Sequence, residues 1–289
     1  MIVVTGATGH LGRGILEKLL PRVPTGQLAA SARDPEKATE LAKQGVTVRQ
    51  GDFADPASLA TAFAGATQVL VVSPNVLGEE GQQLTRNAVE AAQAAGVHRV
   101  LYTSHMAAQA DSAFAPAVNH AAAEALLAKM GMPYTSLRNG YYAESAMFHI
   151  GRAFETGELR APEDGPVSWT TRADLAEANA AVLAEEGSFD GNTPPLVAPE
   201  AFTLAELAAI ASELLGREVK RMVITDAQWR DEKIAQGLPA PVAELLLGSY
   251  RAMRRGEFAA TGPVLEQLLG RRPHTMRDVL TSLLRPTVA

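Results

Sequence analysis

The first twenty residues constrain the fold of this chain more strongly than any other stretch. A short apolar run, Ile2–Val4, leads into a glycine-rich segment. Behind that segment, apolar residues recur at helical spacing on one face, at Leu11, Ile15 and Leu19. This order predicts a buried parallel strand, a tight turn and a helix.

The three glycines of the turn have separate physical roles. Gly6 permits the sharp turn, Gly9 lets a phosphate approach the backbone, and Gly12 lets the helix pack closely on the strand. The helix begins with N–H groups and a positive dipole end that form an anion site. We expect a bound dinucleotide; the alternative is a glycine-rich turn without a ligand. The expected cofactor contacts here are Gly6, Thr8, Gly9, His10, Leu11 and Gly12.

Apolar runs separated by helical patterns continue along the first half of the chain. They predict five more strands, at 27–33, 46–50, 68–72, 99–103 and 134–137. Alternation of this kind is typical of a mostly parallel sheet covered on both faces. We therefore expect an α/β fold, a Rossmann-type doubly wound parallel sheet with a smaller C-terminal α/β substrate domain.

The alternation weakens after about Ser145, which suggests a second unit. We expect residues 1–145 to form an NAD(P)-binding domain and 146–289 a substrate-side domain, with a segment at about 166–186 returning to the main sheet. The elements expected in this half are a strand at 167–170, a helix at 171–186, a strand at 196–198, a helix at 203–215 capped by Thr203, and a strand at 218–224.

The end of the second strand bears on cofactor choice. A carboxylate there suits the ribose hydroxyls of NAD, whereas an arginine suits the extra phosphate of NADP. This chain has Arg33, backed by Ser31. A guanidinium pairs well with a phosphate dianion, so we expect NADPH, with NADH as an alternative donor. The simpler alternative is an exposed arginine near a helix start.

Ligands of a doubly wound sheet lie beyond the carboxyl ends of its strands. The segments after the fourth and fifth strands should therefore line the cofactor. The residues expected there are Ser73, Pro74, Asn75, Thr103, Ser104 and His105.

The usual Tyr-x-x-x-Lys pair of short-chain reductases, in which the tyrosine supplies a proton, is missing after the fifth strand. At the expected place the chain has His120 and Glu124, four residues apart and hence on one helix face. They are candidate active-site residues or merely a helix surface pair. No third ligand of clear spacing accompanies them, so no metal site is expected.

Composition excludes several classes of function. The net charge of −6 argues against broad nucleic-acid binding. No apolar run approaches the roughly 20 residues of a membrane span, and no signal-type segment opens the chain. The absence of cysteine excludes disulfides and fits residence in the cytoplasm. We expect a monomer or homodimer that acts on a small molecule.

Several motifs together resemble the NmrA-like branch of the atypical short-chain dehydrogenases/reductases, and within it the bacterial NAD(P)H:quinone oxidoreductase and triphenylmethane reductase type. The glycine spacing, GxxGxxG, is one of them. The resemblance covers residues 1 to about 175. Its segments are Thr5–Gly12, Gly45–Asp52, Tyr102–Ser104, His120 with Glu124, Leu137–Tyr142 and Thr171–Asp174. The alanines at 121–123 and the loop at 107–117 depart from the pattern near the substrate.

This resemblance implies an NADPH-dependent reductase of quinones or other electrophilic aromatic compounds, with Asp52 and Phe53 against the adenine. Such acceptors take hydride readily and need little acid assistance. We assign His120 a positioning or proton-donor role and Glu124 the task of orienting it. Asn139 and Tyr142 are expected beside nicotinamide or substrate, although Tyr142 also fits a core aromatic residue.

A different class of function competes with the reductase. The same branch includes redox sensors that bind dinucleotides and regulate a partner without catalysis. Nucleotide-sugar epimerases and dehydratases share the fold, but they normally need the Tyr-x-x-x-Lys pair. An obstructed nicotinamide pocket would favour the sensor, and the presence of His120, Glu124 and Tyr142 favours the enzyme.

Overall fold

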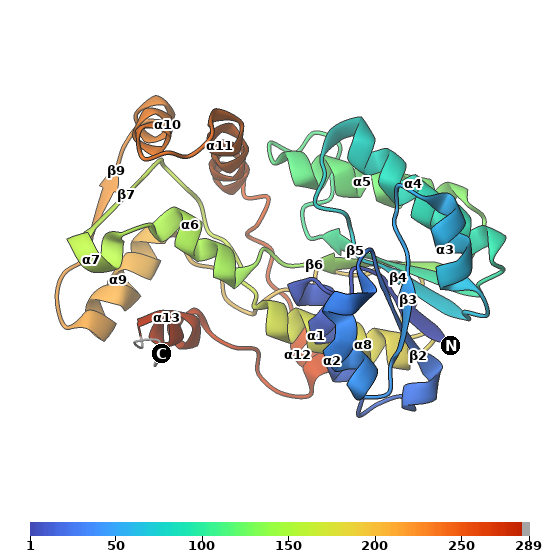
Figure 1. Ribbon diagram of the computed structural model, residues 1–289. Coiled ribbons are helices and arrows are strands. Elements are labelled where there is room, and N and C mark those ends of the chain that lie inside the picture. The colour runs from blue at the N-terminus through green and yellow to red at the C-terminus, as the bar shows by residue number, and fades with distance from the viewer. Residues whose placement is uncertain (285–289) are drawn as a thin grey trace.

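A seven-stranded parallel sheet forms the centre of the computed structural model, which describes residues 1–284 (Figure 1). The strand order is β3-β2-β1-β4-β5-β6-β8, and every neighbouring pair is parallel. The order reverses between β1 and β4, as expected for a doubly wound sheet, so the predicted Rossmann-type fold is confirmed. The strands are β1 (Ile2–Val4), β2 (Leu28–Ala32), β3 (Thr47–Gln50), β4 (Gln68–Val71), β5 (Arg99–His105), β6 (Tyr134–Asn139) and β8 (Gly191–Asn192).

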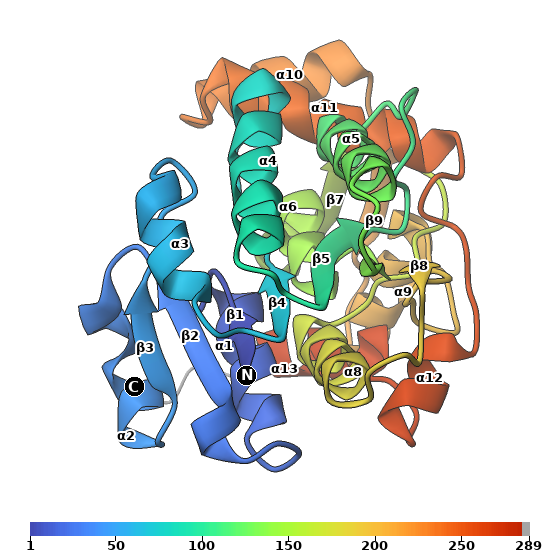
Figure 2. The ribbon, with the colours of Figure 1, turned by 90° about the vertical axis from the view of Figure 1, so that its right-hand side faces the viewer.

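Helices cover both faces of this sheet because its strands are apolar on both sides (Figures 1 and 2). One face carries α1 (His10–Leu19), α2 (Thr39–Lys43), α8 (Arg172–Ala184) and α12 (Val264–Leu269). The other face carries α3 (Pro56–Phe63), α4 (Gly78–Ala94) and α5 (Ala115–Lys129). α8 packs against α1 on this face.

A smaller lobe lies beyond the carboxyl ends of the strands, on the left in Figure 1. Its two-stranded parallel sheet pairs β7 (Glu158–Ala161) with β9 (Lys220–Val223). Its helices are α6 (Ala146–Ile150), α7 (Ala153–Thr156), α9 (Leu204–Leu215), α10 (Asp226–Ala235), α11 (Ala240–Arg254) and α13 (Met276–Leu284). A separate aromatic-rich core, which includes Trp169, Trp229 and Tyr250, holds this lobe together. The domain boundary near residue 145 stays a prediction.

Two expected strands of the second half are wrong. The segment 167–170 forms only isolated bridges, from Val167 to Phe202 and from Thr170 to Tyr142. The segment 196–198 also makes one bridge, and the last strand of the main sheet is β8 instead. Pro194 and Pro195 intervene, and proline has no N–H to continue a ladder. Among residues 1–284, no helix is long and apolar enough to cross a membrane.

Candidate active site

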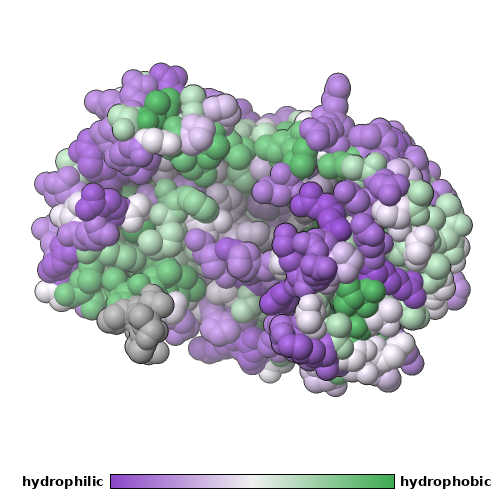
Figure 3. Space-filling model, viewed as in Figure 1, coloured by the Kyte–Doolittle hydropathy of each residue, from purple (hydrophilic) through white to green (hydrophobic). Residues whose placement is uncertain are grey.

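Two adjoining cavities line the carboxyl edge of the main sheet. One has a volume of about 500 Å³ and lies over the glycine turn, β2 and β3. The other, about 360 Å³, lies between β5, β6, α5 and the smaller lobe. Both are bordered by residues 72–76, which follow β4, so they form one continuous cleft across the reversal of strand order. The surface in Figure 3 is hollowed between the two lobes.

The glycine turn has the geometry that its spacing predicts. Gly6 has a φ of +59°, in the left-handed region that favours glycine. A Cβ on Gly12 would overlap the carbonyl oxygen of Gly6, so only glycine lets α1 approach the turn this closely. Gly6, Thr8 and Gly9 line the larger cavity. His10 is exposed and Gly12 buried, and neither lines a cavity, whereas Leu11 lines the smaller one.

The far end of the larger cavity carries one exposed cation and one carboxylate. Arg33, Asp52 and Phe53 line it together with Ser31. Arg33 makes no side-chain hydrogen bond or ion pair with residues 1–284, so its guanidinium is available to an anion. The Asp52 carboxylate accepts from the Ala54 N–H at 3.0 Å and thereby holds its own turn.

Buried hydroxyl groups hold the segment that joins the two cavities. Thr103 accepts the Ser73 N–H at 2.9 Å, and Thr5 accepts the Val72 N–H at 2.8 Å. Thr103 is buried and lines neither cavity, so it supports Ser73 from beneath. Ser73, Pro74 and Asn75 line both cavities. The lining segment is therefore positioned by Thr103, which lines neither cavity, and by Thr5, which lines the larger one.

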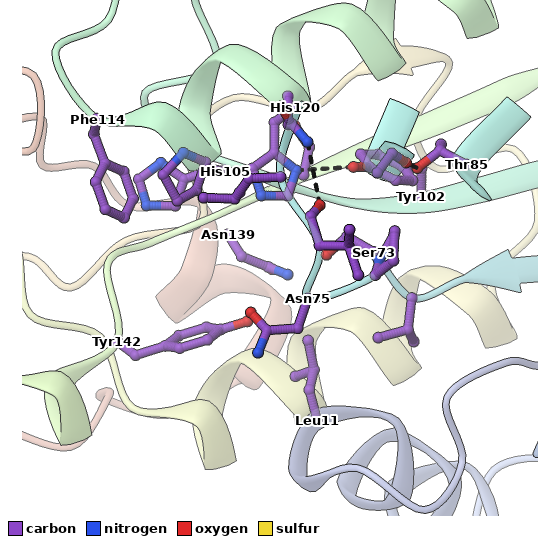
Figure 4. A pocket seen from close by; sticks show the side chains of 18 of the residues that line it. Leu11, Ser73, Asn75, Thr85, Tyr102, His105, Phe114, His120, Asn139 and Tyr142 are labelled. Carbon is purple, nitrogen blue, oxygen red and sulfur yellow. Dashed lines mark hydrogen bonds between the residues drawn. The ribbon is translucent and has the colours of Figure 1, made fainter. Parts of the chain in front are cut away.

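Four polar side chains from three elements meet in the smaller cavity: His105 at the end of β5, His120 on α5, Asn139 at the end of β6, and Tyr142 just beyond it (Figure 4). Among the described residues, no aspartate, glutamate, lysine or arginine lines this cavity. Burial lowers the pKa of His120 to about 4 and that of His105 to about 3, so both rings are neutral at pH 7. The cavity therefore has polar groups but no charge at pH 7.

His120 is oriented by a residue that sequence reasoning missed. Its Nδ1 lies 3.0 Å from the hydroxyl of Tyr102, which is buried on β5 (Figure 4). Burial raises the pKa of Tyr102 above its ordinary value, so the hydroxyl keeps its proton. Tyr102 belongs to a strand that is buried along almost its whole length, so its segment Tyr102–Ser104 carries the resemblance without indicating a role for this hydroxyl.

Glu124 does not contact His120 through a hydrogen bond, which corrects its expected orienting task. Although the two residues share a helix face, the Glu124 carboxylate forms its hydrogen bonds with residues of the main sheet. It accepts from Ser104 at 2.8 Å, Ser136 at 2.9 Å and Asn192 at 2.9 Å, and from Arg138 at 2.6 and 3.0 Å. Glu124 is thus a buried anchor that ties α5 to β5, β6 and β8.

Asn139 supplies the clearest sign of a missing ligand. Its side-chain nitrogen and oxygen are both buried and have no hydrogen-bond partner in residues 1–284. A buried amide without partners costs free energy, so such groups normally face a ligand or water. Asn139 lines the smaller cavity, so its amide is a candidate partner for a ligand bound there. This observation fits the carboxamide of a nicotinamide ring.

Tyr141 and Tyr142 both line the smaller cavity, and Tyr141 also belongs to the core of the smaller lobe. Burial raises the pKa of Tyr142 to about 12, and the Arg172 guanidinium lies 5.4 Å from its ring centre. Tyr141 also lines the cavity but packs edge-on against Trp169 and contacts His149 Nε2 through its hydroxyl at 3.3 Å.

Among residues 1–284, no cluster of three or more metal-ligating side chains occurs.

Comparisons with known proteins agree with this geometry. The model of a family described as NAD(P)H-binding matches residues 6–186, so the chain belongs to the NAD(P)H-binding family. Quinone oxidoreductase 2 of Escherichia coli (strain K12) is 36% identical over 284 residues, which are 98% of this chain and 98% of the relative. An NmrA-like family domain-containing oxidoreductase of Aspergillus flavus is 31% identical, covering 98% of this chain and 94% of that protein.

Solved structures show the same fold over the whole length. The Escherichia coli NADPH-dependent quinone oxidoreductase QOR2 complexed with NADPH has a TM-score of 0.92 at 35% identity, covering 99% of this chain and 100% of that one. The Citrobacter sp. triphenylmethane reductase complexed with NADP(H) has a TM-score of 0.91 at 35% identity, covering 98% and 100%. The resemblance stated from the sequence is therefore confirmed.

Proposed function

We propose that this protein is an NADPH-dependent oxidoreductase that reduces quinones or similar electrophilic aromatic compounds. The observation that carries the proposal is the continuous cleft, which has an available cation at one end and the unsatisfied amide of Asn139 at the other. The names of the relatives support the same activity. The open cavity at the Asn139 end favours catalysis over a purely sensory role.

Different lining residues would bind different parts of the cofactor. Gly6, Thr8 and Gly9 would hold the pyrophosphate with backbone N–H groups, and Arg33 would pair with the ribose phosphate of NADPH. Asn139 would hold the nicotinamide carboxamide. When bound, NADPH supplies a hydride to the acceptor. The chain itself positions the acceptor and excludes water from the smaller cavity.

The uncharged cavity favours an uncharged acceptor. A sulfonated dye or a cationic dye would lose hydration there without meeting an opposite charge, which costs free energy. We expect kcat/KM for a neutral naphthoquinone to exceed that for its sulfonated analogue, and for a cationic triphenylmethane dye, by about tenfold or more. Steady-state oxidation of NADPH with the three acceptors measures this. Equal rates, or a preference for the dye, would contradict the neutral-acceptor assignment.

His120 fits a positioning role better than that of a proton donor, because a ring with a pKa of about 4 is almost entirely neutral at pH 7 and lacks the acidic second proton of an imidazolium. We expect His120→Ala to lower kcat by about tenfold and to leave the Kd for NADPH unchanged. Tyr102→Phe, which removes only the orienting hydroxyl, should lower kcat by a smaller factor. Turnover and fluorescence titration with NADPH measure the two quantities. An unchanged kcat in His120→Ala would remove the role.

Three further assignments stay predictions. The absence of cysteine supports residence in the cytoplasm. The acidic net charge supports a small-molecule substrate rather than a nucleic acid, and the expected oligomeric state is a monomer or homodimer.

A further inference from the structure

His105 differs from the other cavity residues because one of its ring nitrogens is already committed. The backbone N–H of Ala107 donates to His105 Nδ1 at 3.1 Å. A nitrogen that accepts a hydrogen bond carries no proton, so a neutral ring must carry its hydrogen on Nε2. Nε2 has no hydrogen-bond partner in residues 1–284, and the ring lines the smaller cavity. One backbone contact therefore fixes His105 as a donor.

The ring is also clamped in place. Its centre lies 5.7 Å from that of Phe114, 6.0 Å from Tyr141 and 5.5 Å from Phe258, and the last two contacts are edge-on. His120 stacks on it with a centre distance of 6.0 Å and an interplanar angle of 17°. These aromatic contacts restrict rotation of the ring, so the direction of its N–H is set before a ligand arrives.

The clamp places His105 on the side of the smaller cavity that the smaller lobe covers. Phe258 and Tyr141 belong to the aromatic-rich core of the smaller lobe, and Phe114 packs against it. Arg33 and the glycine turn line the other cavity. Figure 4 shows the His105 ring between Phe114 and His120, apart from Leu11. This placement favours a contact of His105 with the second substrate over the expected contact with the cofactor.

We propose that His105 is a preorganised neutral donor that hydrogen-bonds, through Nε2–H, the carbonyl oxygen of the quinone acceptor. The inference rests on the proposed function and adds a catalytic residue to it. The quinone gains two electrons and one hydrogen as hydride from the reduced nicotinamide, which becomes oxidised. The negative charge that develops on the carbonyl oxygen is stabilised by the donor. A proton from water then completes the hydroquinone, and His105 keeps its own.

Two variants of His105 separate donation from packing. His105→Phe keeps an aromatic ring in the clamp but has no donor, whereas His105→Gln keeps an N–H donor on a side chain of similar reach. We expect His105→Phe to lower kcat with a weakly electrophilic quinone by about 10²-fold, as is typical for loss of one such donor. His105→Gln should recover at least about tenfold of that loss, and the Kd for NADPH should stay unchanged in both.

Nitrogen-15 NMR of histidine-labelled protein tests the tautomer without any turnover. The His105 signals, assigned by their loss in His105→Phe, should show protonated Nε2 and unprotonated Nδ1 between about pH 8 and about pH 5. A protonated Nδ1 would overturn the inference, as would equal kcat losses in the two variants or an active His105→Phe. In each of these cases a wild-type chain that reduces quinones leaves the proposed function standing. A wild type without such activity overturns both.

Discussion

Glu124→Ala should lower the free energy of unfolding by about 3–5 kcal/mol, as expected when one partner of a buried ion pair is removed. The variant leaves the half-buried Arg138 guanidinium without its carboxylate and strips Ser104, Ser136 and Asn192 of their shared acceptor. Because these partners come from three strands, the loss also loosens α5 and its His120. Urea unfolding followed by circular dichroism measures the change.

Two other variants act as controls for this result. Glu124→Gln keeps the shape but offers only one accepting oxygen to the same donors, so we expect an intermediate loss. Glu90→Ala removes an exposed carboxylate on α4 that lies 3.8 Å from Arg86, and should change the unfolding free energy by less than about 0.5 kcal/mol. A loss below about 1 kcal/mol in Glu124→Ala would show that the network is not an anchor.

Acid should destabilise the protein well above the pH at which carboxylates titrate. Burial lowers the pKa of His105 and His149 to about 3 and that of His120 to about 4, whereas in the unfolded chain each titrates near its usual pKa of about 6.5. Below about pH 6.5 the unfolded state therefore binds protons that the folded state does not bind. The free energy of unfolding therefore falls by about 1.4 kcal/mol per pH unit for each ring, or by about 4 kcal/mol per pH unit for the three rings together.

The measurement is urea unfolding at several pH values between about 8 and about 4.5. The free energy of unfolding should be level above about pH 7, where all three rings are neutral in both states, and should fall steeply below about pH 6. His105→Phe removes one titrating ring and should reduce the slope by about a third. A free energy that stays level down to about pH 5 would contradict the burial of these histidines.

β1, β2, β4 and β5 could be predicted because each is buried along nearly its whole length. β8 could not, because Gly191 and Asn192 carry no apolar side chain. β7 could not, since Glu158, Leu159, Arg160 and Ala161 offer only two apolar residues and owe their pairing to β9. The predicted strands at 167–170 and 196–198 form only isolated bridges, and Pro194 and Pro195 precede the second of them. The local sequence pattern is thus sufficient to predict strands that are buried in the main sheet. It is insufficient to predict strands whose pairing depends on a distant partner strand.

The candidate site, too, could be predicted from the sequence only in part. The glycine turn, Arg33 and the segment after β4 could be located because their positions follow from the topology of a doubly wound sheet. Phe258, which clamps His105, comes from the part of the chain after residue 224, and nothing in its local sequence indicates that it reaches the site. The turn of Glu124 toward Arg138 could not be foreseen either, because helix-face spacing does not say which neighbour a long side chain reaches.

Oxidation of NADPH by a neutral quinone, followed at the absorbance of the reduced cofactor with NADH in parallel, tests the central claim most directly. The account predicts fast oxidation with kcat/KM for NADPH at least about tenfold above that for NADH, and a loss of most of this preference in Arg33→Ala because a charge-assisted pair is removed. No oxidation of NADPH with any quinone, despite tight binding of NADPH, would contradict the account and identify the protein as a dinucleotide sensor.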